Sequence, residues 1–133
     1  MTTKVILDIV TPYGQILSEE VDEVSASGSE GDFGVLAGHV PFLTTLKIGI
    51  LSYKKGNETV YVFVNSGYVE VTAEKVIVMA DSAEKATDID VERAKASMKR
   101  AEERLKKAEE IDFARATASL ERATIRIQLA QRR

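Results

Sequence analysis

The sequence of 133 residues contains no cysteine and a single histidine, His39. Without cysteine, a disulfide framework, thiol chemistry and a cysteine-ligated zinc site are excluded. The one histidine excludes a histidine-rich metal site and lies in a Gly/Pro-rich loop, where a structural role is favoured over that of a catalytic base. No apolar run approaches the roughly 20 residues of a membrane helix. Because the first residues lead directly into a strand pattern, we expect no signal peptide. The sequence therefore predicts a soluble protein of a reducing compartment.

The motifs of nucleotide-dependent enzymes are also missing. No Gly-x-x-x-x-Gly-Lys-Ser/Thr run occurs, and Gly28, Gly31 and Gly34 do not have the spacing of a dinucleotide site. Glu30 and Asp32 in the same loop could act as acid and base, but exposed loop acids are more often solvated or engaged in binding. We therefore expect no catalytic residue, no metal site and no required cofactor. A small phosphate-binding enzyme is the weakest alternative.

Charge divides the chain into two parts. Residues 1–89 contain 6 Lys/Arg and 13 Asp/Glu, a net charge of −7, whereas residues 90–133 contain 12 and 8, a net charge of +4. Such an asymmetry favours two parts with different partners. The basic part is mixed with glutamate and lacks interleaved aromatic residues, so we expect no nucleic-acid partner.

Residues 1–85 are predicted to form a β-sandwich. Apolar and polar residues alternate from Val5 to Ile9, and the run ends in the turn signal Thr11-Pro12-Tyr13-Gly14. Two further runs, 48–53 and 59–64, flank a polar segment and predict a β-hairpin. Many short strands at regular spacing predict a sandwich of roughly eight to ten strands.

A polar connector is predicted at residues 81–89, between the two parts. Asp88 or Asp90 is expected to cap the helix that follows, because a carboxylate there accepts hydrogen bonds from the free N–H groups of the first turn. Glu92 in that turn is favoured by the helix dipole.

Residues 86–133 are predicted to form a hairpin of two antiparallel helices, since apolar residues recur in steps of three and four on each side of a polar break at 109–112. One row of each helix is entirely alanine: Ala94, Ala101, Ala108, Ala116, Ala123 and Ala130. The other row is large: Val91, Met98, Leu105, Phe113, Leu120 and Ile127. Alanine allows close approach but gives up roughly 2 kcal/mol relative to leucine at each position. The pattern fits a hairpin that can open, and equally a static surface hairpin.

Arginines follow one flank of both predicted helices. In heptad positions, Arg93 and Arg100 of the first helix then lie level with Arg122 and Arg126 of the second, near the open end of the hairpin. Four converging guanidinium groups repel one another, and a phosphate ligand would relieve this repulsion. A solvated basic face and a docking surface for an acidic partner are the alternatives.

The sequence resembles the ε subunit of bacterial F-type ATP synthases over nearly its whole length. The residues that carry the resemblance are Val10-Thr11-Pro12, Ser29-Glu30-Gly31-Asp32-Phe33-Gly34-Val35-Leu36, Gly38-His39-Val40-Pro41, Gly67-Tyr68-Val69-Glu70-Val71 and Ile89-Asp90-Val91-Glu92-Arg93-Ala94. The last resembles the nucleotide-binding Ile/Leu-Asp-x-x-Arg-Ala motif of the family. Two positions depart from the family pattern: Ala37 stands where many members have proline, and Ser66 where many have glycine.

The resemblance implies a ten-stranded β-sandwich with a helical hairpin, in a non-catalytic rotor (central-stalk) subunit at the cytoplasmic face of the bacterial membrane. It implies binding to the γ subunit, to the c-subunit ring through the loop of Glu30 and Asp32, and to the α and β subunits when the hairpin extends and inhibits ATP hydrolysis. ATP would be a regulatory ligand that holds the hairpin down. The implied ATP-binding residues are Glu84, Asp90, Arg93, Arg100, Arg122 and Arg126.

Two expectations stay open. Asp90 is expected either to pair with Arg93 or to accept a hydrogen bond from the ribose or the adenine amine. A protein of another class, a free-standing binding adaptor with the hairpin as a docking coiled coil, is the alternative to the rotor subunit.

Overall fold

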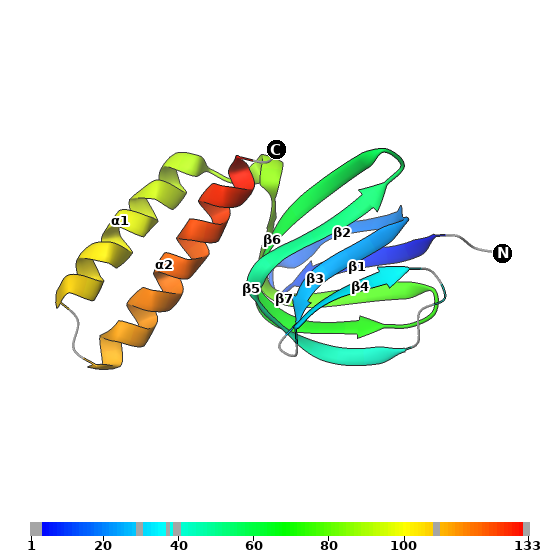
Figure 1. The fold of residues 1–133 in the computed structure, drawn as a ribbon, viewed down its shortest axis with the longest axis horizontal. Helices are drawn as coiled ribbons and strands as arrows, with labels where there is room; N and C mark the ends of the chain where they lie inside the picture. The colour runs from blue at the N-terminus through cyan, green and yellow to red at the C-terminus, as the bar shows by residue number, and fades with distance from the viewer. Residues whose placement is uncertain (1–3, 29–30, 37, 39–40, 108–109, 132–133) are drawn as a thin grey trace.

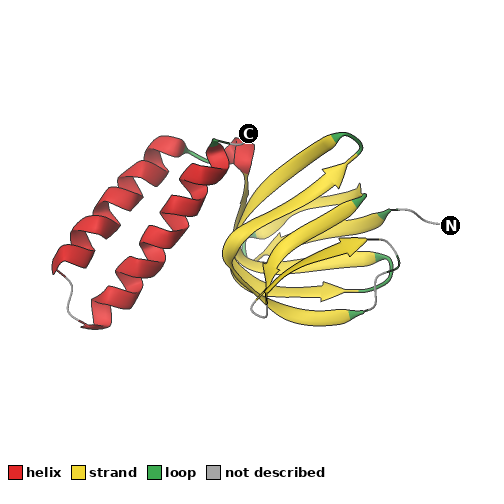
Figure 2. Cartoon of the chain, viewed as in Figure 1, coloured by secondary structure: helices red, strands yellow, loops and turns green. Residues whose placement is uncertain are grey.

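A computed structural model describes residues 4–28, 31–36, 38, 41–107 and 110–131 (Figure 1). The strands are β1 (Val5–Thr11), β2 (Gly14–Val21), β3 (Glu23–Gly28), β4 (Gly31–Leu36), β5 (Phe42–Lys55), β6 (Glu58–Val71) and β7 (Lys75–Lys85). A short 3₁₀ helix, η1 (Ala86–Asp88), leads to α1 (Val91–Lys107) and α2 (Glu110–Ala130). The predicted class, a β-sandwich followed by a two-helix hairpin, is therefore confirmed (Figure 2).

The strands form one coiled sheet in the order β2-β1-β7-β6-β5-β3-β4. All neighbours are antiparallel except β1 and β7, which are parallel. The sheet coils so that β2 also meets β5, where the Tyr53 hydroxyl donates a 2.9 Å hydrogen bond to Glu19. Burial, and then this hydrogen bond, raise the pKa of Tyr53 above its usual value. The coil encloses a core of valine, leucine and isoleucine.

Three neighbouring strands change their buried face at one level of the sheet. In β6, Val62 and Val64 point into the core, whereas beyond Gly67 the buried residues are Val69 and Val71. The ladders of β6 with β5 and with β7 both skip Ser66, which has a φ of 48°. The register is the same on both sides of Ser66 in the two ladders, so no residue is inserted there and the three strands change face together. Each half of these strands thereby buries its own apolar face as the sheet bends from one layer to the other.

Gly67 permits the close approach that this bend requires. Its φ is 137°, and a Cβ placed on it would lie 2.1 Å from the carbonyl oxygen of Met79. Ser66 carries a side chain in the left-handed region, and its hydroxyl donates a 3.1 Å hydrogen bond to Asp81 on β7. Ser66, which stands where many members of the family have glycine, is thus held in this conformation by its hydrogen bond to Asp81.

The bend explains two differences from the predicted elements. The described residues form seven strands rather than eight to ten, because β5, β6 and β7 continue through the bend; divided there, they would give ten. The predicted connector at residues 81–89 is wrong for residues 81–85, which complete β7 and pair with β6 as far as Lys85. This part of β7 lies beyond its pairing with β1 and is paired with β6 alone. Only Ala83 of these residues points into the core, so the run lacks apolar alternation and polarity alone did not reveal the strand.

The two helices pack along the alanine row, as predicted. Ala94, Ala101, Ala116 and Ala123 are buried. Ala130 is buried in a cluster with residues of the sandwich, and Ala108 lies outside the described residues. The large row is only half-buried, and Phe113 is 54% exposed. The alanines bring the helices close enough that the large side chains lie beside the seam. The break between the helices is also shorter than predicted, since α2 already begins at Glu110.

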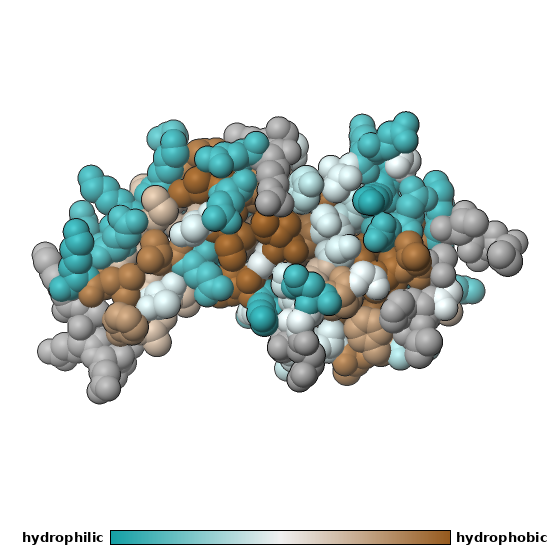
Figure 3. Space-filling model, viewed as in Figure 1, coloured by the Kyte–Doolittle hydropathy of each residue, from teal (hydrophilic) through white to brown (hydrophobic). Residues whose placement is uncertain are grey.

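The hairpin lies against the sandwich through α2, which is placed between α1 and the sheet (Figure 1). Leu129 and Ala130 at the end of α2 join Phe63, Ala86 and Ile89 in a second apolar cluster, separate from the core of the sandwich. The space-filling view shows apolar side chains where the two parts meet and hydrophilic ones along the outer side of the hairpin (Figure 3). The structure therefore has the hairpin folded against the sheet.

Candidate functional site

The candidate site begins with a register pair on the outer face of the sheet. Phe63 on β6 and Glu84 on β7 are direct cross-strand partners. Opposite residues of an antiparallel pair point to the same face, with Cβ atoms about 5 Å apart. Their neighbours Val64 and Ala83 point into the sandwich core, so Phe63 and Glu84 both point outward, toward α2.

Arg126 of α2 lies over this pair. Its Nε donates a 2.8 Å hydrogen bond to Oε1 of Glu84, and its guanidinium carbon lies 4.3 Å from the centroid of the Phe63 ring. The Phe63 side chain is fully buried, whereas the side chains of Arg126 and Glu84 remain 25% and 34% exposed. The guanidinium thus has a carboxylate at one edge and an aromatic face beneath it, both of which attract a cation.

Apolar residues surround this contact. Besides the second cluster itself, Ile48 and Ile50 of β5, Tyr61 of β6, Val91 of α1 and Ile125 of α2 pack against it. The buried Phe63 ring, which belongs to this cluster, covers one face of the guanidinium. Exclusion of water from that face strengthens the interactions of the guanidinium with Glu84 and the ring.

Asp90 has a structural role in the folded hairpin. Its Oδ1 accepts a 3.1 Å hydrogen bond from the backbone N–H of Arg93, three residues on. Its carbonyl accepts the first helical hydrogen bond, from Ala94. Asp90 is therefore the N-cap of α1, one of the two caps that the sequence predicted.

The other predicted arginines are exposed or half-buried on the hairpin. Arg93 and Arg100 are exposed and Arg122 is half-buried. Nη2 of Arg100 donates to the Ser97 hydroxyl at 3.0 Å on the same helix. In the described part of the chain, hydrogen bonds connect two pairs of the six predicted ATP-binding residues: Arg126 donates to Glu84, and the backbone of Arg93 donates to Asp90. The convergence of the four guanidinium groups stays a prediction.

The loop predicted to meet the c-subunit ring is described in part. Asp32 is exposed on β4 and lines an open groove of about 300 Å³ with Ser25, Ser27, Gly34 and Ser52. Glu30 lies outside the described residues, as do His39 and Ala37. Their predicted roles therefore stay predictions.

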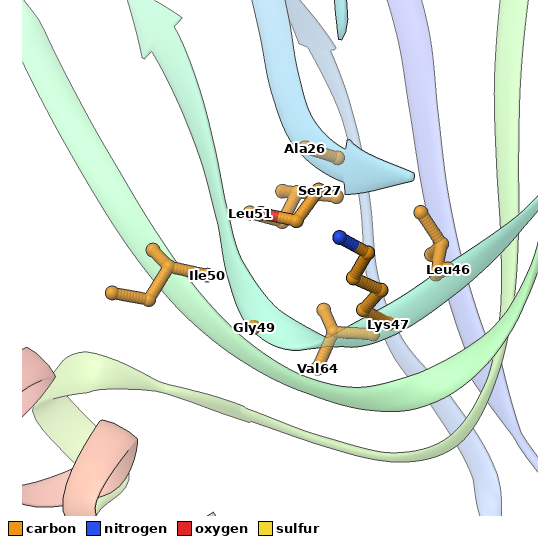
Figure 4. Close-up of a pocket in the computed structure, with 8 residues that line it drawn as sticks. All are labelled: Ala26, Ser27, Leu46, Lys47, Gly49, Ile50, Leu51 and Val64. Atoms are coloured by element: carbon orange, nitrogen blue, oxygen red, sulfur yellow. The ribbon is translucent and has the colours of Figure 1, made fainter. Parts of the chain in front are cut away.

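A second hollow lies where β3 separates from β5 and holds only about 10 Å³ (Figure 4). The Lys47 side chain extends toward Ser27 there, and apolar residues form most of the wall (Figure 4).

Among the described residues, no group of His, Cys, Asp and Glu is placed to hold a metal ion. Within the same residues, no helix is long and apolar enough to cross a membrane.

Sequence reasoning missed Phe63 as part of the site. A signal was present in the run Val60-Tyr61-Val62-Phe63-Val64, which is apolar at every position. A strand that is apolar on both faces is covered on both faces. The run therefore indicated that another element packs on the outside of β6.

Comparisons with known proteins agree with this architecture. The family model described as "ATP synthase, Delta/Epsilon chain, beta-sandwich domain" matches residues 4–86, and "ATP synthase, Delta/Epsilon chain, long alpha-helix domain" matches residues 87–131. An "ATP synthase epsilon chain" of Thermodesulfovibrio yellowstonii is 57% identical over 106 residues, covering 80% of this chain and 76% of the relative. That of Geobacter metallireducens is also 57% identical, covering 80% and 77%.

Two solved structures share the fold at low sequence identity. A chain of the Euglena gracilis mitochondrial ATP synthase structure with OSCP, F1 and c-ring has a TM-score of 0.84 at 23% identity, covering all of this chain and 84% of its own length. A chain of the Tetrahymena thermophila central stalk and c-ring structure has a TM-score of 0.62 at 14% identity, covering 97% and 98%.

Proposed function

The chain belongs to the ATP synthase delta/epsilon family, and from that premise we propose that it is a rotor subunit whose hairpin regulates ATP hydrolysis. It is the non-catalytic epsilon subunit of an F-type ATP synthase. In the proposed cycle, the hairpin folded on the sandwich permits hydrolysis, and the extended hairpin reaches the α and β subunits and inhibits it.

The observation that carries the switching proposal is the contact between α2 and the outer face of β5 and β6. That contact is made by one end of α2, around Leu129 and Arg126, whereas α1 adds Val91 at its first turn. An interface this local can separate while the sandwich core stays intact. The alanine seam adds a second weak joint, because each alanine buries little apolar surface.

ATP is the proposed ligand that stabilises the folded hairpin. Arg126 joins the hairpin to the sandwich, and Arg93, Arg100 and Arg122 add positive charge on the helices. Guanidinium groups suit phosphate oxygens because their planar donors can form paired hydrogen bonds. A ligand that binds only the folded form would shift the equilibrium toward it.

The γ subunit is the proposed partner of the outer sandwich face away from α2. Tyr68 and Met79 are cross-strand partners there, and both are exposed. Leu43 on β5 and Ile6 on β1 are exposed as well. Exposed large apolar side chains on neighbouring strands are typical of a protein–protein interface.

The c-subunit ring is the proposed partner of the β3–β4 end, through Asp32 and Glu30. With both contacts made, the protein would be peripheral at the cytoplasmic face of the membrane, held there through the complex. The proposed position needs no membrane helix of its own.

The switching proposal is tested by a crosslink that keeps the hairpin folded in the reconstituted F1 complex. Because the chain has no cysteine, Ile50→Cys on β5 and Ile125→Cys on α2 would be the only thiols of this subunit, and a short thiol crosslinker would join them. Relief of the inhibition of ATP hydrolysis is expected, while each single variant treated in the same way should still inhibit. Unchanged inhibition in the crosslinked complex would refute the switch. Failure to co-purify with the α, β and γ subunits would instead favour a free-standing adaptor.

A further inference from the structure

We propose that Phe63 and Glu84 are positioning residues that orient Arg126, so that its two terminal nitrogens bind the phosphate groups of a nucleotide. The inference rests on the proposed ATP-binding function and assigns roles within that site. It adds Phe63, and it changes the role of Glu84 from a nucleotide contact to an orienting group.

Within the part of the chain that the structure describes, the guanidinium group of Arg126 keeps free donors after it binds Glu84. Arginine has five N–H donors, one on Nε and four on the two Nη atoms. Nε is engaged by Glu84 at 2.8 Å. Among the described residues, neither Nη of Arg126 has a hydrogen-bond partner, and a quarter of the side chain is exposed. The donors that remain are therefore the end-on pair, which matches two phosphate oxygens.

The orientation of that pair is fixed from two directions. The ring of Phe63 covers one face of the guanidinium at 4.3 Å, and the carboxylate of Glu84 fixes its edge. A side chain restrained in both ways cannot rotate about its terminal bonds without losing one contact. Arg126 thus loses little further rotamer freedom when an anion binds, which favours affinity.

Glu84 is poorly suited to contact a triphosphate directly. Its carboxylate carries the same sign of charge as phosphate, and like charges at close range repel. The register with Phe63 places it beside the ring and under α2, where it meets the guanidinium from the sandwich side. The site requires the Glu84 carboxylate oxygen as the acceptor that orients Arg126. The negative charge of the same carboxylate disfavours binding of a phosphate group nearby.

This geometry predicts how three substitutions rank. Glu84→Ala removes the acceptor and should weaken ATP binding, whereas Glu84→Gln retains an oxygen at the same position and should bind ATP as tightly as the unmodified chain or more tightly. Phe63→Leu keeps an apolar side chain but removes the aromatic face, and should weaken ATP binding roughly three- to tenfold. Phe33→Leu is the matched control, because Phe33 is a half-buried phenylalanine that packs against Phe42 elsewhere in the sandwich.

The positioning role is first measured without any ligand, by NMR of arginine Nε–H groups in the full chain. Arg126 should give a resonance that exchanges slowly with water and is shifted by the ring current of Phe63. We expect Glu84→Ala to speed the exchange and Phe63→Leu to remove the shift, while Phe33→Leu changes neither. If Phe63 orients Arg126, Phe63→Leu should also speed the exchange of its Nε–H, which loss of the ring current alone would not do. A fast-exchanging Arg126 signal in the unmodified chain, or an exchange rate that neither Glu84→Ala nor Phe63→Leu changes, would overturn the positioning role.

Calorimetric titration with ATP then tests whether the oriented Arg126 binds the nucleotide. With Arg126 confirmed as oriented, weaker binding by Phe63→Leu and Glu84→Ala, with binding preserved in Glu84→Gln, supports the inference. Equal affinity in all variants, or loss of binding in Glu84→Gln comparable to Glu84→Ala, would refute it. Absence of ATP binding by the unmodified chain refutes the proposed nucleotide function itself, and the NMR result still decides whether Phe63 and Glu84 orient Arg126.

Discussion

Asp90 accepts a 3.1 Å hydrogen bond from the backbone N–H of Arg93 and so caps the first helix of the hairpin. The resemblance to the ε family places the same residue in a nucleotide-binding motif. Both roles meet at the point where the chain leaves the sandwich, next to the buried Ile89. A residue that caps α1 influences the stability of the hairpin with or without a ligand.

Asp90→Ala should lower the stability of the hairpin by about 1 kcal/mol, because α1 loses its N-cap. Asp90→Asn should retain most of the stability, since an amide oxygen accepts the same hydrogen bond. Thermal unfolding followed by circular dichroism measures the difference. If Asp90→Asn nevertheless abolishes ATP binding, the carboxylate contacts the nucleotide as well as capping the helix.

Enlarging the alanine row should separate the helices. Ala101 and Ala123 are each 1% exposed in the seam, so Ala101→Leu or Ala123→Leu should destabilise the hairpin by about 1–3 kcal/mol through overpacking. Ala96→Leu on the exposed side of α1 is the control and should change stability by less than about 0.5 kcal/mol. The measurement is thermal unfolding of the helices followed by circular dichroism. Equal melting temperatures for the two seam variants and the Ala96→Leu control would contradict the buried alanine seam.

Gly67→Ala should be among the most damaging single substitutions in the sandwich. The added Cβ would lie 2.1 Å from the Met79 carbonyl oxygen, and strand β7 cannot retreat without breaking its ladder; we expect a loss of about 3 kcal/mol or more. Gly14 has a similar φ of 130° but open space around it. Gly14→Ala should therefore cost only the backbone strain, about 1–2 kcal/mol, when both are measured by chemical denaturation.

Asp8 should contribute to the acid sensitivity of the sandwich. The Ser18 hydroxyl, followed by Lys75 at 2.9 Å, lowers the pKa of Asp8 below its usual value. A carboxylate whose pKa is lower in the folded state stabilises the fold above its unfolded pKa of about 4, and this stability is lost as the pH falls through the folded value. Asp8→Asn should therefore flatten the decline of unfolding free energy below about pH 4. An unchanged acid profile in that variant would show that Asp8 does not contribute.

The sequence alone determined the class of the fold and most of its elements. Alternation from Val5 to Ile9, the turn at Thr11–Gly14 and the hairpin through Gly56 follow from local rules, because each depends on residues close together in the chain. The alanine seam was also predictable, since the period of the α-helix places Ala94, Ala101, Ala116 and Ala123 on one face. Candidate arginines could be named for the same reason.

Only the tertiary structure decided how the two parts meet. The change of buried face at Ser66 depends on the coiling of the whole sheet, and the pairing of Phe63 with Glu84 depends on the register between strands of different length. Neither is encoded by a local pattern, and Arg126 lies 42 residues from Glu84 in the chain. Heptad positions indicated which flank of α2 carries Arg126, but the ring and carboxylate that it meets belong to a sheet whose outer face forms only when the sandwich has folded.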